Sequence, residues 1–141
     1  MKDIEWSLQE STQDGKRRLD IVLGMKVRAY VRQTRMTRFS RDFHGKYARE
    51  YIENQHQLRD TFTLLMKKHG QEMFGKVRLG CSISVYGPTA SRPDLSNLEK
   101  AVEDAANKSV WIDDRYIYER SFGKKEKAPE DRLELSVWEL P

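Results

Sequence analysis

Residues able to hold a divalent cation and a phosphate gather in the second half of the chain. Asp94 follows a proline turn at the start of a helical pattern, and Asp113 and Asp114 follow a short apolar run. Carboxylates at a helix start and at a strand start can meet at one edge of a sheet and bind a cation. Lys100 stands one turn beyond Ser96 on the polar side of the helical pattern, where a phosphate can reach it. The combination indicates a cation site beside a phosphate site.

Each of these acids also has an ordinary structural explanation. An aspartate after a proline, such as Asp94, usually caps a helix, and an acidic pair before a strand, such as Asp113 and Asp114, usually belongs to a turn. Adjacent carboxylates repel each other, however, and a bound cation is a good reason for them to lie close together. We therefore favour the cation-binding interpretation.

The elements that must position these residues are two helices and several strands. Apolar residues at i, i+3 and i+4 spacing predict one helix over 95–106 and a longer one over 46–69. Alternating apolar residues predict strands over 18–31, 76–86, 116–122 and 133–138. The order strand, helix, strand, helix and hairpin predicts an α+β fold, with two main helices packed on a mixed β-sheet.

At 141 residues, the length and composition are those of one globular domain. We assign 18–141 to this domain and 1–17 to an N-terminal extension, which is either an additional strand or a flexible arm. No apolar run approaches the roughly 18 residues of a membrane span, and the N-terminus lacks the apolar region of a signal peptide. The single Cys81 lies in a strand pattern and is interpreted as a buried structural thiol, which favours a cytosolic compartment.

Positive charge is concentrated between residues 16 and 46, where ten basic residues stand against two acidic ones. Such a segment attracts polyanions such as nucleic acid, although it can also be an ordinary solvated surface. Arg32, Arg35 and Arg38 are spaced three apart, with Phe39 and Phe43 close by. Arginines interleaved with aromatic residues suit phosphate contact and base stacking, so we predict a DNA-binding loop over 33–44.

The acidic residues and their neighbours form an ordered motif that resembles a known family. The motif residues are Asp94-Leu95-Ser96-Asn97, then Lys100, then Trp111-Ile112-Asp113-Asp114, and finally Ile117, Glu119 and Lys124. The series resembles the D-x-D-N, lysine and D-D pattern of the RusA-type Holliday junction resolvases, which are small phage and prophage endonucleases. The resemblance is strong over 77–139, weaker over 19–70 and absent before that.

The resemblance implies a Mg²⁺-dependent homodimeric nuclease, with Mn²⁺ as a substitute ion, that cuts paired strands across a four-way DNA junction. Asp94 and Asp114 would be the principal metal ligands and Asp113 a secondary one, while Lys100 would offset charge on the scissile phosphate. The backbone of the DNA would be held by basic residues, namely Arg28, Arg32, Arg35, Arg38 and Lys124. Phage or prophage origin would place the protein in the cytoplasm of a bacterial host.

Ser96 departs from the family pattern, which has a second aspartate at this position. A neutral hydroxyl binds Mg²⁺ far more weakly than a carboxylate does. Ser96 could instead cap the helix, because Ser96 and Glu99 fit the capping-box pattern. Alternatively Glu99 supplies the missing charge; Glu103 is two turns away from Ser96 and is expected to be too distant. A third alternative is a deliberate replacement that inactivates the enzyme.

Two other functions remain open at this point. A catalytically inactive homologue would bind branched DNA tightly and in a salt-sensitive manner, without metal-dependent cleavage. A phage regulatory protein would use the basic surface to bind a protein partner and would not prefer branched over linear DNA.

Overall fold

The computed structural model describes residues 6–30, 43–121 and 123–141, and it has the α+β fold that the sequence predicts. Among the described residues, six strands form one mixed sheet and two α-helices accompany it. The elements are β1 (Ser7–Gln13), β2 (Lys16–Leu23), α2 (Phe43–Lys68), β3 (Leu79–Gly87), α3 (Leu95–Ala106), the 3₁₀ helix η1 (Asp114–Tyr116), β4 (Ile117–Arg120), β5 (Lys125–Lys127) and β6 (Arg132–Glu139).

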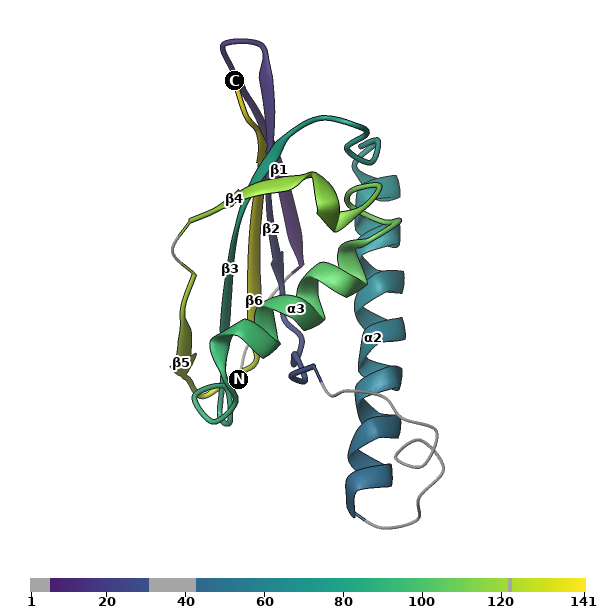
Figure 1. Ribbon diagram of the computed structural model, residues 1–141, viewed down its shortest axis with the longest axis vertical. Coiled ribbons are helices and arrows are strands. Elements are labelled where there is room, and N and C mark those ends of the chain that lie inside the picture. Colours follow the sequence, from purple (N-terminus) through teal and green to yellow (C-terminus); the bar gives the residue numbers. More distant parts are fainter. Residues whose placement is uncertain (1–5, 31–42, 122) are drawn as a thin grey trace.

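The sheet has the strand order β1-β2-β6-β3-β4, with β5 also paired to β3 (Figure 1). The pairs β1–β2, β2–β6 and β6–β3 are antiparallel, whereas β4 and β5 run parallel to β3. The predicted closing hairpin is therefore wrong, because β3 lies between β4 and β6. The charged segment that was expected to form its turn instead includes β5, which pairs with β3 further along the edge that β4 occupies.

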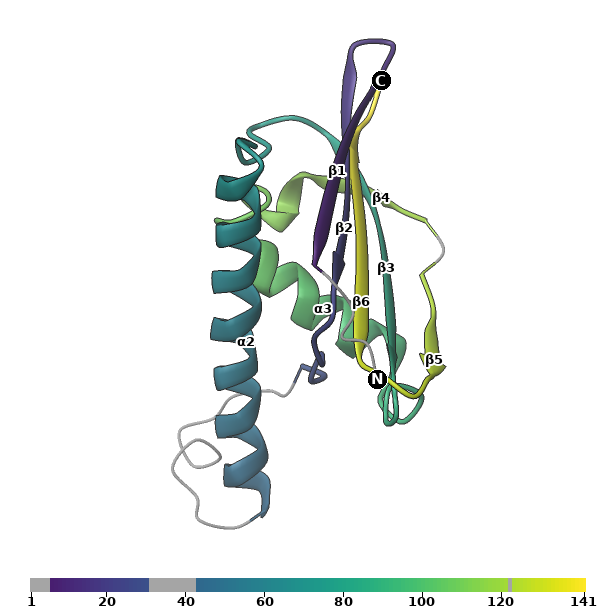
Figure 2. The same cartoon turned by 180° about the vertical axis from the view of Figure 1, so that it is seen from behind.

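One face of the sheet is apolar and covered, and the other is more polar. Along β2, Leu19, Ile21 and Leu23 are buried, and the residues between them are partly exposed. The same alternation continues along β6. The helix α3 lies across the apolar face and α2 runs beside α3, whereas the view from behind shows β1 and β6 uncovered by either helix (Figure 2). The polar edge of α3, formed by Ser96, Glu99, Lys100 and Glu103, faces Arg120 of β4.

The N-terminal residues contribute a strand to this sheet. Of the two alternatives for residues 1–17, the structure supports the additional strand, because β1 pairs with β2 along its whole length. Within the described residues, none of the helices has the combination of length and apolar composition that crossing a membrane requires.

The predicted first strand is too long, because β2 ends at Leu23. Residues 24–30 have no regular structure although Val27 and Ala29 are buried. The alternating pattern continued past the strand because this segment packs against α2. Asn54 of α2 accepts a hydrogen bond from the Arg28 backbone N–H at 2.9 Å and donates one to the Lys26 carbonyl at 2.8 Å. These two bonds replace the strand pairing that the segment lacks.

The remaining boundaries agree better with the sequence pattern. The helix α3 covers the predicted residues 95–106, and α2 begins three residues earlier than expected. Cys81 is buried in β3, as predicted. Burial, reinforced by the nearby Glu103 carboxylate, raises the pKa of its thiol to about 12. The thiol is therefore neutral and has a structural role.

Candidate active site

A pocket of about 330 Å³ lies between the polar edge of α3 and the segment that leads into β4. One helix edge supplies four of its residues, which follow each other at i, i+3, i+4 and i+7 spacing: Ser96, Glu99, Lys100 and Glu103. Asp114 of η1 and Arg120 of β4 form the rest of the lining. Three acids and two bases therefore share one small opening.

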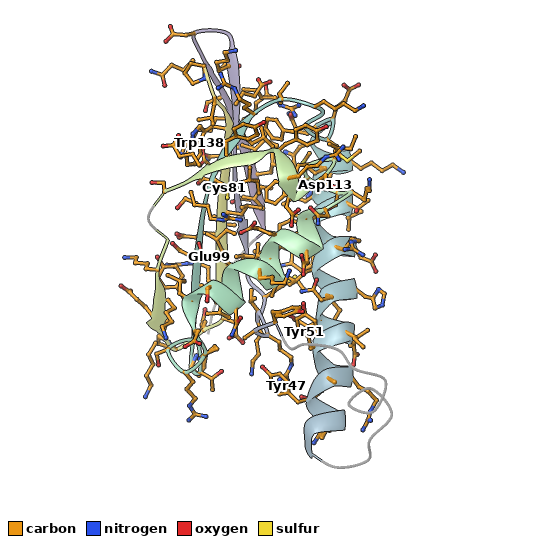
Figure 3. All side chains as sticks on the ribbon, viewed as in Figure 1. Tyr47, Tyr51, Cys81, Glu99, Asp113 and Trp138 are labelled. Carbon is orange, nitrogen blue, oxygen red and sulfur yellow. The ribbon has the colours of Figure 1, made fainter. Side chains whose placement is uncertain are left out.

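The pocket brings together three residues at positions of the family motif, namely Ser96, Lys100 and Asp114. Asp94 and Asp113 are not among the lining residues. Asp94 is exposed and is the N-cap of α3, although its side chain makes no capping hydrogen bond. Figure 3 places Glu99 on α3 and Asp113 beyond the far end of that helix, before β4.

Asp113 has the structural role of a turn residue. Its carboxylate accepts a hydrogen bond of 3.0 Å from the Arg115 backbone N–H and caps η1. This bond holds the pKa of Asp113 below its ordinary value. Asp113 is therefore ionised at neutral pH, and it stands beside Asp114, which does line the pocket.

Ser96 does not cap α3, so the capping-box interpretation is wrong. The helix begins at Leu95 with Asp94 as its N-cap, which places Ser96 inside the first turn. Its exposed side chain lines the pocket instead. Serine therefore occupies a position at which any side chain faces the candidate site.

Glu103 lines the same pocket as Ser96, and the expectation that it is too distant to replace the missing carboxylate stays a prediction. It is only 4% exposed, and its carboxylate accepts two hydrogen bonds from the Arg120 guanidinium. The bonds measure 2.9 Å from Nε to Oε2 and 2.5 Å from Nη2 to Oε1. Sequence reasoning missed Arg120 because it lies on a different element; only the i+7 spacing of Glu103 from Ser96 hinted at a shared surface.

Lys100 is placed by contacts on both sides of it. Its Nζ lies 3.6 Å from Oδ2 of Asp104 and 4.8 Å from the centre of the Tyr30 ring. The Tyr30 backbone N–H donates a 2.9 Å hydrogen bond to the Asn97 carbonyl, which fixes segment 24–30 against α3. With 48% of its side chain exposed, Lys100 can still reach a bound phosphate.

Two further carboxyl groups of α3 have raised pKa values. Burial raises the pKa of Glu99, and the neighbouring Glu103 carboxylate raises it further, against the opposing effect of Arg120. Burial is also the main reason why the pKa of Asp104 is raised, and Lys100 acts against it. An added cation in the pocket would favour the ionised form of Glu99.

The oxygen donors that line the pocket are of the types that bind divalent cations. Asp114 and Glu99 offer carboxylates and Ser96 offers a hydroxyl, which are the donor types that Mg²⁺ and Mn²⁺ accept. In the described part of the chain, however, no three carboxylate, imidazole or thiol groups come together closely enough to form a metal cluster. The carboxylate of Glu103 is already bound to Arg120.

The predicted DNA-binding residues are only partly described. Arg28 lies 3.1 Å from Glu50, with its guanidinium 6.0 Å from the centre of the Tyr47 ring. Lys124 lies 3.3 Å from Glu126 on the edge formed by β5. Arg32, Arg35 and Arg38 lie outside the described residues, so the predicted DNA-binding loop stays a prediction.

Comparison with known proteins supports the resemblance that the motif suggested. The family model of Endodeoxyribonuclease RusA matches residues 1–137, which includes the N-terminal residues that the motif did not reach. The Crossover junction endodeoxyribonuclease RusA of Shigella sonnei (strain Ss046) is 33% identical over 87 residues, covering 58% of this chain and 69% of that protein. These matches support an endodeoxyribonuclease function at crossover junctions. The chain belongs to the RusA family of endodeoxyribonucleases.

Proposed function

We propose that the protein is a divalent-metal-dependent endonuclease that resolves four-way DNA junctions by cutting paired strands. The observation that carries this proposal is the convergence of Ser96, Lys100 and Asp114 on one pocket. Lys100 and Asp114 match the family motif and Ser96 stands at the position of its second aspartate, and the three residues come from two elements separated by the turn after α3.

The roles of the residues follow from their chemistry and placement. A bound Mg²⁺ or Mn²⁺ supplies an activated water and offsets negative charge on the phosphate. Asp114 would hold the ion from η1 and Asp94 from the start of α3, with Asp113 as a secondary ligand. Lys100, anchored between Asp104 and Tyr30, would contact the scissile phosphate and stabilise the charge that develops on it.

Ser96 weakens the proposed metal site without changing its surroundings. The serine hydroxyl stands where a carboxylate would point into the same pocket, so we expect a lower affinity for the cation and slower cleavage. Glu99 is the nearest lining carboxylate along the helix and would take over part of this function.

The DNA would be held through its backbone by Arg28 and Lys124 together with Arg32, Arg35 and Arg38. Such contacts position a duplex without reading its sequence, which suits a substrate recognised by its shape. We further propose a homodimer, because paired cuts require two active sites. A phage or prophage protein of this kind would act in the cytoplasm of a bacterial host.

A four-way junction and a linear duplex of the same total length test this proposal directly. The protein is expected to bind the junction more tightly and to cut it in Mg²⁺, whereas EDTA or Asp114→Asn abolishes cutting and leaves binding in place. Equal affinity for both DNAs together with no cleavage would contradict the proposal.

A second candidate function follows from Ser96 alone. A protein that lacks one metal ligand can keep its affinity for junctions and lose its activity. This non-catalytic function would be indicated by preferential junction binding without cleavage at any concentration of Mg²⁺ or Mn²⁺.

A further inference from the structure

The pair of Glu103 and Arg120 is a feature of the pocket that the family motif does not account for. Glu103 is 4% exposed, although it lies on a helix whose other buried residues are apolar. Burial of a carboxylate is unfavourable unless a charge and hydrogen bonds accompany it. Arg120 supplies both from β4, across the pocket.

The geometry of the pair leaves Arg120 able to bind something else. Glu103 takes the Nε and Nη2 edge of the guanidinium, and an arginine has more N–H donors than one carboxylate accepts. Among the residues that the structure describes, no second side chain forms a hydrogen bond or an ion pair with the Arg120 guanidinium. Half of its side chain, 51%, is exposed. The opposite edge of the guanidinium is therefore open to a second anion.

The surroundings of Arg120 indicate which anion this would be. Lys100 lines the same pocket from the opposite wall. An arginine fork and a lysine ammonium that share an opening form a common arrangement for binding phosphate oxygens. The pair is half-exposed on the arginine side, and exposed or buried ion pairs add little net stability, so stability alone does not explain its presence.

We propose that Arg120 binds a backbone phosphate of the DNA next to Lys100, and that Glu103 is a positioning residue that fixes the plane of the guanidinium. This inference rests on the proposed function, because it requires DNA to enter the pocket. Arg120 thereby supplies a fixed positive charge in a pocket where Ser96 stands in place of the negatively charged aspartate of the family.

The salt dependence of DNA binding distinguishes a phosphate contact from a merely structural pair. Each phosphate contact contributes about 0.9 to the slope of log K against log salt concentration. The double variant Glu103→Gln/Arg120→Gln removes both charges together, so the buried Glu103 position is not left with an unpaired carboxylate. We expect it to bind the junction about tenfold more weakly, with a slope lower by about one.

Two further variants serve as controls. Arg120→Lys keeps the charge and should retain the slope with a smaller loss of affinity, because lysine cannot form the bidentate contact. Arg132→Gln removes another arginine of the sheet, which is paired with Glu134 outside this pocket. It should leave the affinity for the junction and the salt slope unchanged. Thermal melting of each variant checks that it is folded.

The outcomes for this inference and for the proposed function are separable when linear duplex is measured in parallel. If the wild-type protein prefers the junction but the double variant keeps its slope and affinity, the phosphate contact is refuted while the proposed function stands. If Arg132→Gln lowers the junction affinity and the salt slope as much as the double variant does, the phosphate contact of Arg120 is also refuted. If the wild-type protein shows no preference for the junction, the proposed function fails, and the slopes on duplex still decide whether Arg120 touches phosphate. Failure to bind either DNA overturns both.

Discussion

At the scale of single residues, the pocket is defined by charged side chains of α3 and by Asp114 and Arg120, which face them. Glu99 and Glu103 lie one turn apart, and only Glu103 has an arginine partner in the described residues. The raised pKa of Glu99 follows from its burial and from this neighbouring carboxylate. The charge on Glu103 and Arg120 therefore affects the protonation of Glu99.

Glu99→Gln is expected to stabilise the protein at neutral pH. The pKa of Glu99 in the folded state lies above its ordinary value of 4.5 in the unfolded chain, so ionisation favours unfolding. This penalty is absent below pH 4.5, grows between pH 4.5 and the raised folded-state pKa, and is fully present above that pKa. Melting temperatures should therefore be higher for the variant at pH 7 and equal to wild type at low pH. The exposed Glu53→Gln is the control, and equal stabilisation at both pH values would contradict the account.

At the scale of elements, most of what the sequence predicted depended on local periodicity. The helix α3 was predicted at its observed boundaries because its apolar residues repeat cleanly. The pairing of β4 with β3 could not be predicted, because it depends on contacts between residues far apart in the chain. Segment 24–30 was misassigned for a related reason: its alternating burial arises from packing on α2 and α3.

In the candidate site, too, local spacing predicted some residues, and contacts between distant parts of the chain could not be predicted. Ser96, Lys100 and Asp114 were found by motif and spacing, and the structure brings them to one pocket. Arg120 was missed because nothing local links a strand residue to Glu103, seventeen positions away. The metal-ligand roles of Asp94 and Asp113 stay predictions, since neither residue lines the pocket.

Asn54 is expected to determine how firmly segment 24–30 is attached to α2. Asn54→Leu preserves size but leaves the Arg28 N–H and the Lys26 carbonyl without their partner, which should cost about 2 kcal/mol of unfolding free energy. Denaturant unfolding measures this cost. Thr63→Ala on the exposed side of the same helix is the control and should change stability by less than about 0.5 kcal/mol. Equal effects of the two variants would show that the hydrogen bonds of Asn54 are not important.

At the scale of the whole molecule, paired cutting requires two pockets to act on one junction. The described residues of one chain contain one pocket with the motif residues. We therefore expect light scattering during size-exclusion chromatography to give twice the 16.6 kDa mass of the chain, both free and bound to a junction. A single chain per junction would contradict the homodimer and would predict isolated nicks in place of paired cuts.

The central claim is that the pocket of Ser96, Lys100 and Asp114 is a metal-dependent nuclease site that lacks one anionic ligand. Ser96→Asp places a carboxylate at the position that faces this pocket. Cleavage of a labelled four-way junction should then accelerate on the order of tenfold or more at limiting Mg²⁺, with EDTA abolishing it. Unchanged or slower cleavage by a folded Ser96→Asp variant that still binds the junction would contradict the claim.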